Sequence, residues 1–173
     1  MQPKTGRSAP PELRVDFAGC PVKASLDVLG RKWALLVLRN IELYRVERFN
    51  EMLRITPGLT KRVLAMRLKE LEHGGFIRAV ERGHNYTRWG LTAKGKDALP
   101  ILMALVHFGS KWYADEVFLD RRPRSLIDVF ERSYIRTTLR ELIAAGTPRT
   151  IGRRKMLGTP RGAVAIAVEP PLA

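Results

Sequence analysis

Regularly spaced breaker residues divide the middle of this chain into helix-length segments, and their spacing constrains the fold more than any other feature. Proline favours the first position of a helix, and glycine favours the position after its end. Between residues 20 and 92 the breakers leave room for four short helices and two strand-length runs, with a longer helix after them. The fold class is therefore expected to be mainly α with a small β-hairpin (α+β).

Hydrophobic periodicity predicts the four helices that precede the hairpin. The second is apolar on nearly every side, so we expect it to be the buried centre of the domain. Thr60 is a good N-cap for the fourth, directly after a turn of Thr56, Pro57 and Gly58. The four helices are expected over residues 21–29, 32–43, 49–55 and 60–73.

Apolar residues at three- and four-residue spacing predict the faces that the other three helices turn inward. We expect these stripes to pack around the second helix and to leave the opposite faces polar. The stripes are Val22, Leu26 and Leu29 in the first helix; Phe49, Met52 and Leu53 in the third; and Val63, Leu64, Leu68 and Leu71 in the fourth.

A β-hairpin and a long helix are expected after the fourth helix. Residues 76–80 and 86–91 are predicted strands, joined by a tip over residues 81–85. Thr92 is the expected N-cap of a helix over residues 93–113. Helices joined by such a turn and followed by a hairpin are the plan of the winged helix-turn-helix.

The chain divides into four predicted parts. Residues 1–19 are expected to be a flexible arm, and residues 20–113 form the winged-helix domain. Residues 114–146 are a predicted C-terminal helical extension, in which residues 124–145 are expected to be helical. Residues 147–173 are basic, punctuated by glycine and proline, and expected to be a flexible tail.

The charge favours a polyanionic partner. The chain has 31 Lys and Arg against 17 Asp and Glu, a net charge of +14, and residues 20–113 hold 17 of the basic and 8 of the acidic residues. Nucleic acid is the first candidate and an anionic membrane surface the second. No apolar run approaches 18 residues and the start of the chain has no apolar signal region, so no membrane association is predicted.

No constellation of residues points to catalysis, a metal or a cofactor. Motifs such as GxGxxG, GxSxG, the P-loop and HExxH are missing from the sequence, and His73, His84 and His107 are scattered. The single cysteine excludes an intramolecular disulfide and a multi-cysteine zinc site. We therefore expect a protein of the reducing cytoplasm that is not an enzyme.

The fourth helix is the candidate recognition helix. Its N–H groups and positive dipole end can face phosphate, arginine can pair with guanine, and apolar side chains can contact a thymine methyl group. A solvated amphipathic helix is the alternative interpretation. The outward side chains expected to contact DNA are Thr60, Lys61, Arg62, Ala65, Met66 and Lys69.

The hairpin tip is the second candidate DNA contact. Gly83 permits a tight reversal, and Arg82, His84, Asn85 and Arg88 surround it. Arginines on a short loop suit the minor groove or its flanking phosphates. The alternative is an ordinary exposed loop, and for His84 alone that alternative is preferred.

The long helix is apolar on two faces, which one small domain does not bury. Ile101, Leu105, Phe108 and Trp112 form one face and are expected to pair with a second copy of the chain. The alternative is that the C-terminal extension covers them. The other face carries Leu102, Val106 and Tyr113.

Cys20 lies at the start of the first predicted helix. A thiol at a helix N-terminus can have a lowered pKa, which would suit a redox sensor. A structural role as a small capping or buried residue is the other interpretation.

Several short motifs occur between Cys20 and Trp112 in a characteristic order. They are Cys20-Pro21, Leu26-Asp27-Val28-Leu29-Gly30, Lys32-Trp33, Leu36-Val37-Leu38-Arg39, Arg48-Phe49-Asn50-Glu51-Met52, Pro57-Gly58-Leu59-Thr60, Val63-Leu64, Arg67-Leu68-Lys69-Glu70-Leu71-Glu72, Leu91-Thr92 and Lys94-Gly95. Together these motifs resemble the HxlR-type transcriptional regulators, which are similar to the wider multiple-antibiotic-resistance (MarR-like) regulators.

The resemblance implies a homodimer that binds double-stranded operator DNA, with the fourth helix in the major groove and the hairpin alongside as a wing. It also implies that a cysteine at the position of Cys20 senses oxidants in some members. The chain departs from the family in lacking prolines in the wing, where Trp89 replaces the usual tyrosine, and in continuing to residue 173. A shorter wing is therefore expected.

The sequence thus predicts a cytoplasmic, nucleoid-associated regulator that recognises a pseudo-palindromic operator, with no cofactor and an unidentified small-molecule or redox effector as a candidate partner. A basic protein that binds nucleic acid without sequence preference is the alternative. A protein-binding adaptor built on the same fold is a second one.

Overall fold

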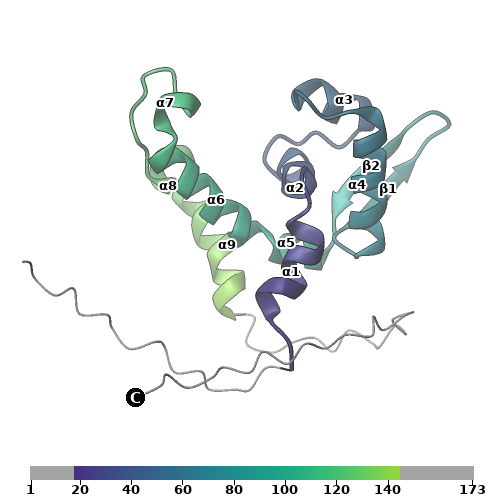
Figure 1. The fold of residues 1–173 in the computed structure, drawn as a ribbon, viewed down its shortest axis with the longest axis horizontal. Helices are drawn as coiled ribbons and strands as arrows, with labels where there is room; N and C mark the ends of the chain where they lie inside the picture. Colours follow the sequence, from purple (N-terminus) through teal and green to yellow (C-terminus); the bar gives the residue numbers. More distant parts are fainter. Residues whose placement is uncertain (1–17, 145–173) are drawn as a thin grey trace, which may run out of the picture.

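The computed structural model describes residues 18–144, so most of the predicted arm and the whole tail over residues 147–173 lie outside the described part. Within that part four helices lead into a two-stranded hairpin, and five helices follow it (Figure 1). The elements are α1 (Pro21–Leu29), α2 (Ala34–Glu42), α3 (Phe49–Ile55), α4 (Lys61–His73), β1 (Ile77–Arg82), β2 (Thr87–Leu91), α5 (Ala93–Asp97), α6 (Leu99–Trp112), α7 (Ala114–Val117), α8 (Leu126–Val129) and α9 (Arg132–Ala144).

One hydrophobic core lies between the first four helices and the base of the hairpin. The prediction that α2 is its centre is confirmed, because Val37 and Leu38 are completely buried. Met52 of α3 and Leu64 and Leu71 of α4 pack into the same cluster. Each such burial contributes about 1.5–3 kcal/mol, so the core holds α3 and α4 in place.

The turn between α3 and α4 depends on a glycine and a cap. Gly58 has φ +81°, a conformation that side chains other than glycine rarely adopt. Thr60 then caps α4, and its Oγ1 accepts a hydrogen bond from the Val63 N–H at 3.3 Å. The predicted third and fourth helices and the turn between them are confirmed.

A buried hydrogen bond joins α2 to the residue that follows α3. The Asn40 side-chain amide donates to the Thr56 hydroxyl at 2.9 Å, and both residues are buried. The Arg39 guanidinium in turn donates to the Asn40 side-chain oxygen Oδ1 at 2.9 Å. Because a buried polar group without a partner is costly, this bond fixes the turn relative to α2.

β1 and β2 form an antiparallel hairpin, with Ile77 opposite Leu91 at the base and Arg82 opposite Thr87 near the tip. The sequence predicts strands over residues 76–80 and 86–91, but β1 continues to Arg82. The connection therefore shortens to residues 83–86. The expectation of a wing shorter than that of the family stays a prediction.

A third segment extends the hairpin at the edge of β2, which the sequence pattern did not predict. The Glu47 carbonyl accepts a hydrogen bond from the Trp89 N–H at 3.0 Å, and Arg48 forms an isolated bridge with Arg88. The loop between α2 and α3 is thus joined to the wing by its backbone.

The prediction of one continuous helix over residues 93–113 is wrong. The helix is broken at Ala98, between α5 and α6, and Pro100 lies in the first turn of α6. Proline has no N–H, and its ring clashes with the carbonyl four residues earlier, so it is tolerated in a first turn but not inside a longer helix.

The predicted inward stripe of α1 is wrong for two of its three residues. Leu29 is buried, but Val22 is 64% exposed and Leu26 is 56% exposed. The C-terminal end of α1 packs on the core, whereas its N-terminal half projects beyond it (Figure 1). Apolar surface of α1 therefore remains uncovered within the described residues.

The extension forms helices, although not the single one expected over residues 124–145. Phe130 is extended between α8 and α9 and ends the first of them. Both helices pack against α6, and Leu126, Phe130 and Leu139 are half-buried. The Arg124 N–H donates to the Ser110 carbonyl at 3.1 Å, which ties the extension to α6.

Replacing Asn40 by alanine should lower the free energy of unfolding by about 1–3 kcal/mol, because the buried Thr56 hydroxyl loses its partner. Urea denaturation followed by circular dichroism measures the change. Asn50→Ala, at an exposed position of α3, is the matched control and should stay within about 0.5 kcal/mol of the parent. Equal stability of the two variants would contradict the role of this bond.

Gly95→Ala should destabilise the protein by about 1–3 kcal/mol, because the added Cβ would overlap the carbonyl of Phe76. Gly109→Ala is the control, since a Cβ there meets no atom within 4 Å. That change should stabilise α6 by about 0.5–1 kcal/mol. The melting temperature of each variant is compared with that of the wild type. Shifts of both variants in the same direction would contradict this account.

Candidate nucleic-acid interface

The outward face of α4 brings together all six side chains that the sequence predicts on the recognition helix. Thr60, Lys61, Arg62, Ala65, Met66 and Lys69 are all exposed. Leu64, Leu68 and Leu71 are buried on the opposite face. None of the three cations of this outward face forms an ion pair within residues 18–144, so their charge is available to an anionic partner.

Arg67 is a charged member of the inward face that sequence reasoning missed. It is only 9% exposed and pairs with Glu70, whose other carboxylate oxygen lies 3.8 Å from Arg31 Nη1. This chain of charges joins α4 to the turn between α1 and α2. The signal was its position, four residues after Val63 and four before Leu71 on the apolar stripe.

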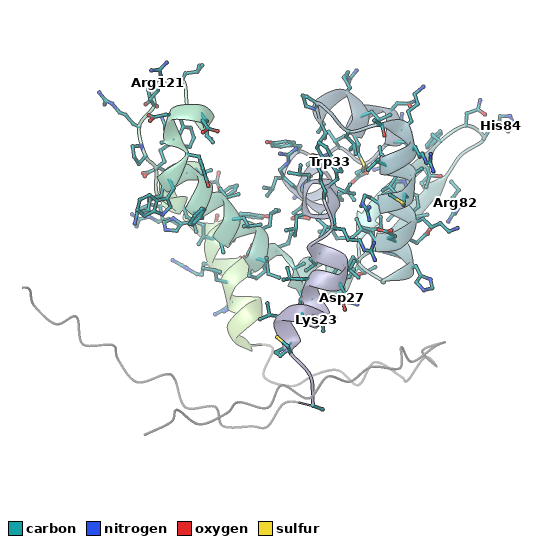
Figure 2. All side chains as sticks on the ribbon, viewed as in Figure 1. Lys23, Asp27, Trp33, Arg82, His84 and Arg121 are labelled. Carbon is teal, nitrogen blue, oxygen red and sulfur yellow. The ribbon has the colours of Figure 1, made fainter. Side chains whose placement is uncertain are left out.

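The wing lies beside α4 and carries the other predicted DNA contacts. His84 is at the hairpin tip, and Arg82 is on the strand that leads to it (Figure 2). Arg82, His84 and Asn85 are exposed. Arg82 Nη2 is 3.3 Å from Glu72 Oε1 on the last turn of α4, so the hairpin and the helix are joined by an ion pair.

Arg88 differs from the other predicted wing residues because two carboxylates hold it. Its Nε and Nη2 donate to Glu47 Oε2 at 3.0 and 2.6 Å, and its Nη1 donates to Glu81 Oε2 at 3.0 Å. These bonds, that to Glu47 foremost, raise the pKa of the guanidinium. The side chain is half-buried and already neutralised within the protein.

Tyr86 and Arg48 complete this cluster at the wing. The Tyr86 hydroxyl donates to Glu81, and this bond, followed by that from Arg88, lowers the pKa of the Glu81 carboxyl. The Arg48 guanidinium lies 4.6 Å from the centre of the Tyr86 ring. Sequence reasoning missed these contacts, because residues 47 and 48 are separated from the wing by about forty positions.

The predicted dimerisation face of α6 is exposed. Ile101, Leu105, Phe108 and Trp112 expose between 42 and 64% of their surface. On the other face Leu102 is buried and Val106 half-buried, although Tyr113 is half exposed. The described part of the extension packs on α6 without covering the row.

An apolar groove continues this exposed face toward α1. Its volume is about 340 Å³, and it lies between α1, α2 and α6. The exposed Val22 and Leu26 of α1 and Ile101 of α6 form its rim. The uncovered apolar surface thus extends from α6 to α1.

Cys20 is exposed and occupies the N-cap of α1, as its sequence position predicts. Its Sγ accepts a hydrogen bond from the Lys23 N–H at 3.5 Å. The geometry is that of a capping residue, and the redox role stays a prediction.

Neither a membrane-spanning helix nor a metal-binding cluster occurs in residues 18–144. α6, the longest helix there, has 14 residues, whereas a span needs about 20. No three His, Cys, Asp or Glu side chains in this range gather as ligands of one ion would.

Regulators of transcription are among the known proteins that this chain is similar to. The chain is 33% identical over 104 residues to the HTH-type transcriptional regulator YdeP of Bacillus subtilis (strain 168). The aligned region covers 59% of this chain and 80% of YdeP. PA1607, a candidate transcription factor of known crystal structure, is 32% identical with a TM-score of 0.51, over 62% of this chain and 72% of that one. A candidate MarR-family regulator from Porphyromonas gingivalis W83 is 26% identical with a TM-score of 0.47, over 56% and 96% of the two chains.

The family model for the HxlR-like helix-turn-helix matches residues 28–117, more than half of the chain. This range begins within α1 and ends with α7, so it contains the recognition helix, the wing and the exposed row of α6. The chain belongs to the HxlR-like helix-turn-helix family and is a transcriptional regulator, not an enzyme.

Proposed function

We propose that the protein is a homodimer that recognises a pseudo-palindromic operator, with α4 of each copy in the major groove. The observation that carries the proposal is a group of exposed cations on α4 that form no ion pair among the described residues, beside a wing that an ion pair attaches to the same helix. This arrangement presents two elements to adjacent grooves of one duplex.

On α4, Lys61, Arg62 and Lys69 supply charge to phosphates, and Arg62 can pair with the edge of a guanine. The first turn adds backbone N–H groups and the positive end of the helix dipole. Ala65 and Met66 provide apolar contact for a thymine methyl group. Thr60 both caps the helix and lies at its DNA-facing end.

On the wing, we propose that Arg82, His84 and Asn85 contact the minor groove or its phosphates. Arg88 takes a different role from the phosphate contact that the sequence predicts. Because Glu47 and Glu81 already hold its guanidinium, we propose that it positions the wing against the loop between α2 and α3.

The proposed dimer buries the exposed row Ile101, Leu105, Phe108 and Trp112, together with Val22 of α1 and its neighbours at the groove. An uncovered apolar surface of this kind marks a protein interface. A two-fold axis would place the recognition helices on half-sites about 10 bp apart or a multiple of that. A regulator that binds chromosomal DNA would act at the nucleoid, in the cytoplasm.

Selection of bound duplexes from random DNA tests the proposal. The expected product is an inverted repeat that the full chain binds at least about tenfold more tightly than a scrambled duplex at physiological salt. Equal affinity for both duplexes would overturn sequence-specific recognition and favour a protein that binds DNA through charge alone.

Arg62→Ala and Arg82→Ala should separate base recognition from backbone contact. Loss of Arg62 removes a contact to a base edge, so the base preference should relax at one position at a cost of about 1–3 kcal/mol. Loss of Arg82 removes a wing charge and should weaken all sequences by a similar factor. Gel shifts with the selected operator measure the affinity. If both variants bound it as tightly as the wild type, α4 and the wing would not be the DNA contacts.

Glu47→Gln tests whether Arg88 positions the wing or contacts phosphate. The two roles predict opposite changes in operator affinity. If Arg88 positions the wing, the change should weaken operator binding severalfold, because the wing loses its anchor. If Arg88 contacts phosphate, the change should strengthen binding, because it frees the guanidinium and removes a negative charge near DNA. Fluorescence anisotropy with labelled operator measures the affinity.

Glu51→Gln is the matched control for this experiment. Glu51 lies in the first turn of α3 and makes no hydrogen bond or ion pair through its side chain among the described residues. Glu51→Gln should leave operator affinity unchanged or raise it slightly. The control thus measures the effect of removing one negative charge alone.

A further inference from the structure

α9 presents a row of three arginines to solvent. Arg132, Arg136 and Arg140 recur every four residues, and all three are exposed. The other side of the helix, which includes the buried Thr138 and the half-buried Tyr134, packs against α6 and α8. Because residues four apart lie on one helix face, the arginines form one continuous edge.

This arrangement is unfavourable for α9 without a partner. Like charges four residues apart repel each other, and Arg132 is the first residue of the helix, at the positive end of its dipole. No ion pair involving these arginines occurs among the side chains that the structure describes. The nearby Glu131 carboxylate accepts a hydrogen bond from the Ser133 hydroxyl instead. An anionic partner would offset the repulsion.

Glu141 directly follows the row, and the sequence beyond it has the same charge as the row. Residues 142–168 contain no Asp or Glu, and five basic residues occur there: Arg149, Arg153, Arg154, Lys155 and Arg161. A net positive charge of this kind favours a polyanionic partner. The match to the family ends at residue 117, so both the row and this segment lie outside the part that the chain shares with its family.

The row is far from the proposed operator site. α9 and the hairpin lie on opposite sides of the molecule, with the core helices between them (Figure 1). A duplex bound by α4 and the wing therefore does not contact the arginine row of the same protomer. Eight residues of helix span about 12 Å, and each DNA strand presents a phosphate about every 3.4 Å along the axis, so the row can follow a backbone.

We propose that Arg132, Arg136 and Arg140 bind the phosphate backbone of a second DNA duplex, without sequence preference. The protein would then hold two DNA segments together while α4 is bound to an operator. This inference rests on the proposed function only for the first of the two duplexes.

A bridging assay with the full chain tests the inference. The operator obtained by selection is fixed to beads, the protein is bound, and a labelled duplex of unrelated sequence is added. The wild type should retain the labelled duplex, and Arg132→Gln/Arg136→Gln/Arg140→Gln should retain at least about tenfold less while binding the operator as before. Three phosphate contacts predict a log–log salt slope of about −2.7, or about a 40-fold fall in affinity for the second duplex from 50 to 200 mM salt.

The control Arg132→Lys/Arg136→Lys/Arg140→Lys keeps the charge and should retain the labelled duplex. Equal retention by the glutamine variant and the wild type would overturn the inference. So would a wild type that binds the operator beads but retains no second duplex. Failure of the operator proposal has a separate signature, because the protein itself would then not be enriched on operator beads over scrambled ones.

Discussion

The burial of α2 is the constraint on which the half of the molecule proposed to face DNA depends. Val37 and Leu38 provide its apolar contacts, and Asn40 provides a directional one to Thr56. Apolar packing alone would let α3 and α4 slide across the surface of α2, since dispersion contacts are not directional. The buried hydrogen bond removes that freedom at the turn that leads into α4.

The basic side chains of the described residues fall into two groups, those that pair with carboxylates of the protein and those that do not. Carboxylates of the protein hold Arg67, Arg82 and Arg88. The pair of Arg67 lies within α4, whereas the pairs of Arg82 and Arg88 join the hairpin to α4 and to the loop between α2 and α3. The cations at the start of α4 and on α9 form no such pairs among the described residues. Some basic side chains are thus paired within the fold, and others have no such pair among the described residues, which composition does not reveal.

Apolar surface is divided in a similar way along the fifth and sixth helices. The break at Ala98 lets α5 cap the hairpin end of the core while α6 leaves it in another direction. α6 then turns one side to α8 and α9 and leaves Ile101 and Trp112 exposed on the other. The exposed N-terminal half of α1 adds to the same uncovered surface, which accounts for an apolar stripe that the core does not use.

The sequence by itself determined the elements whose signals are local. Proline, glycine and threonine set the limits of α3, the turn and α4, because capping and turn conformations involve residues a few positions apart. The same periodicity placed all six outward residues of α4 on one face. The family resemblance rested on these same short motifs.

Only the tertiary structure decided which side chains are shared between distant segments. Glu47 and Arg88 are 41 positions apart, and nothing in the local sequence shows that Arg88 pairs with Glu47 while Arg82 of the same hairpin pairs with Glu72 of α4. Whether Val22 and Leu26 are buried likewise depends on how far the core extends, which local periodicity cannot show. Pairing and burial are properties of the packed chain, since both depend on groups that only folding brings together.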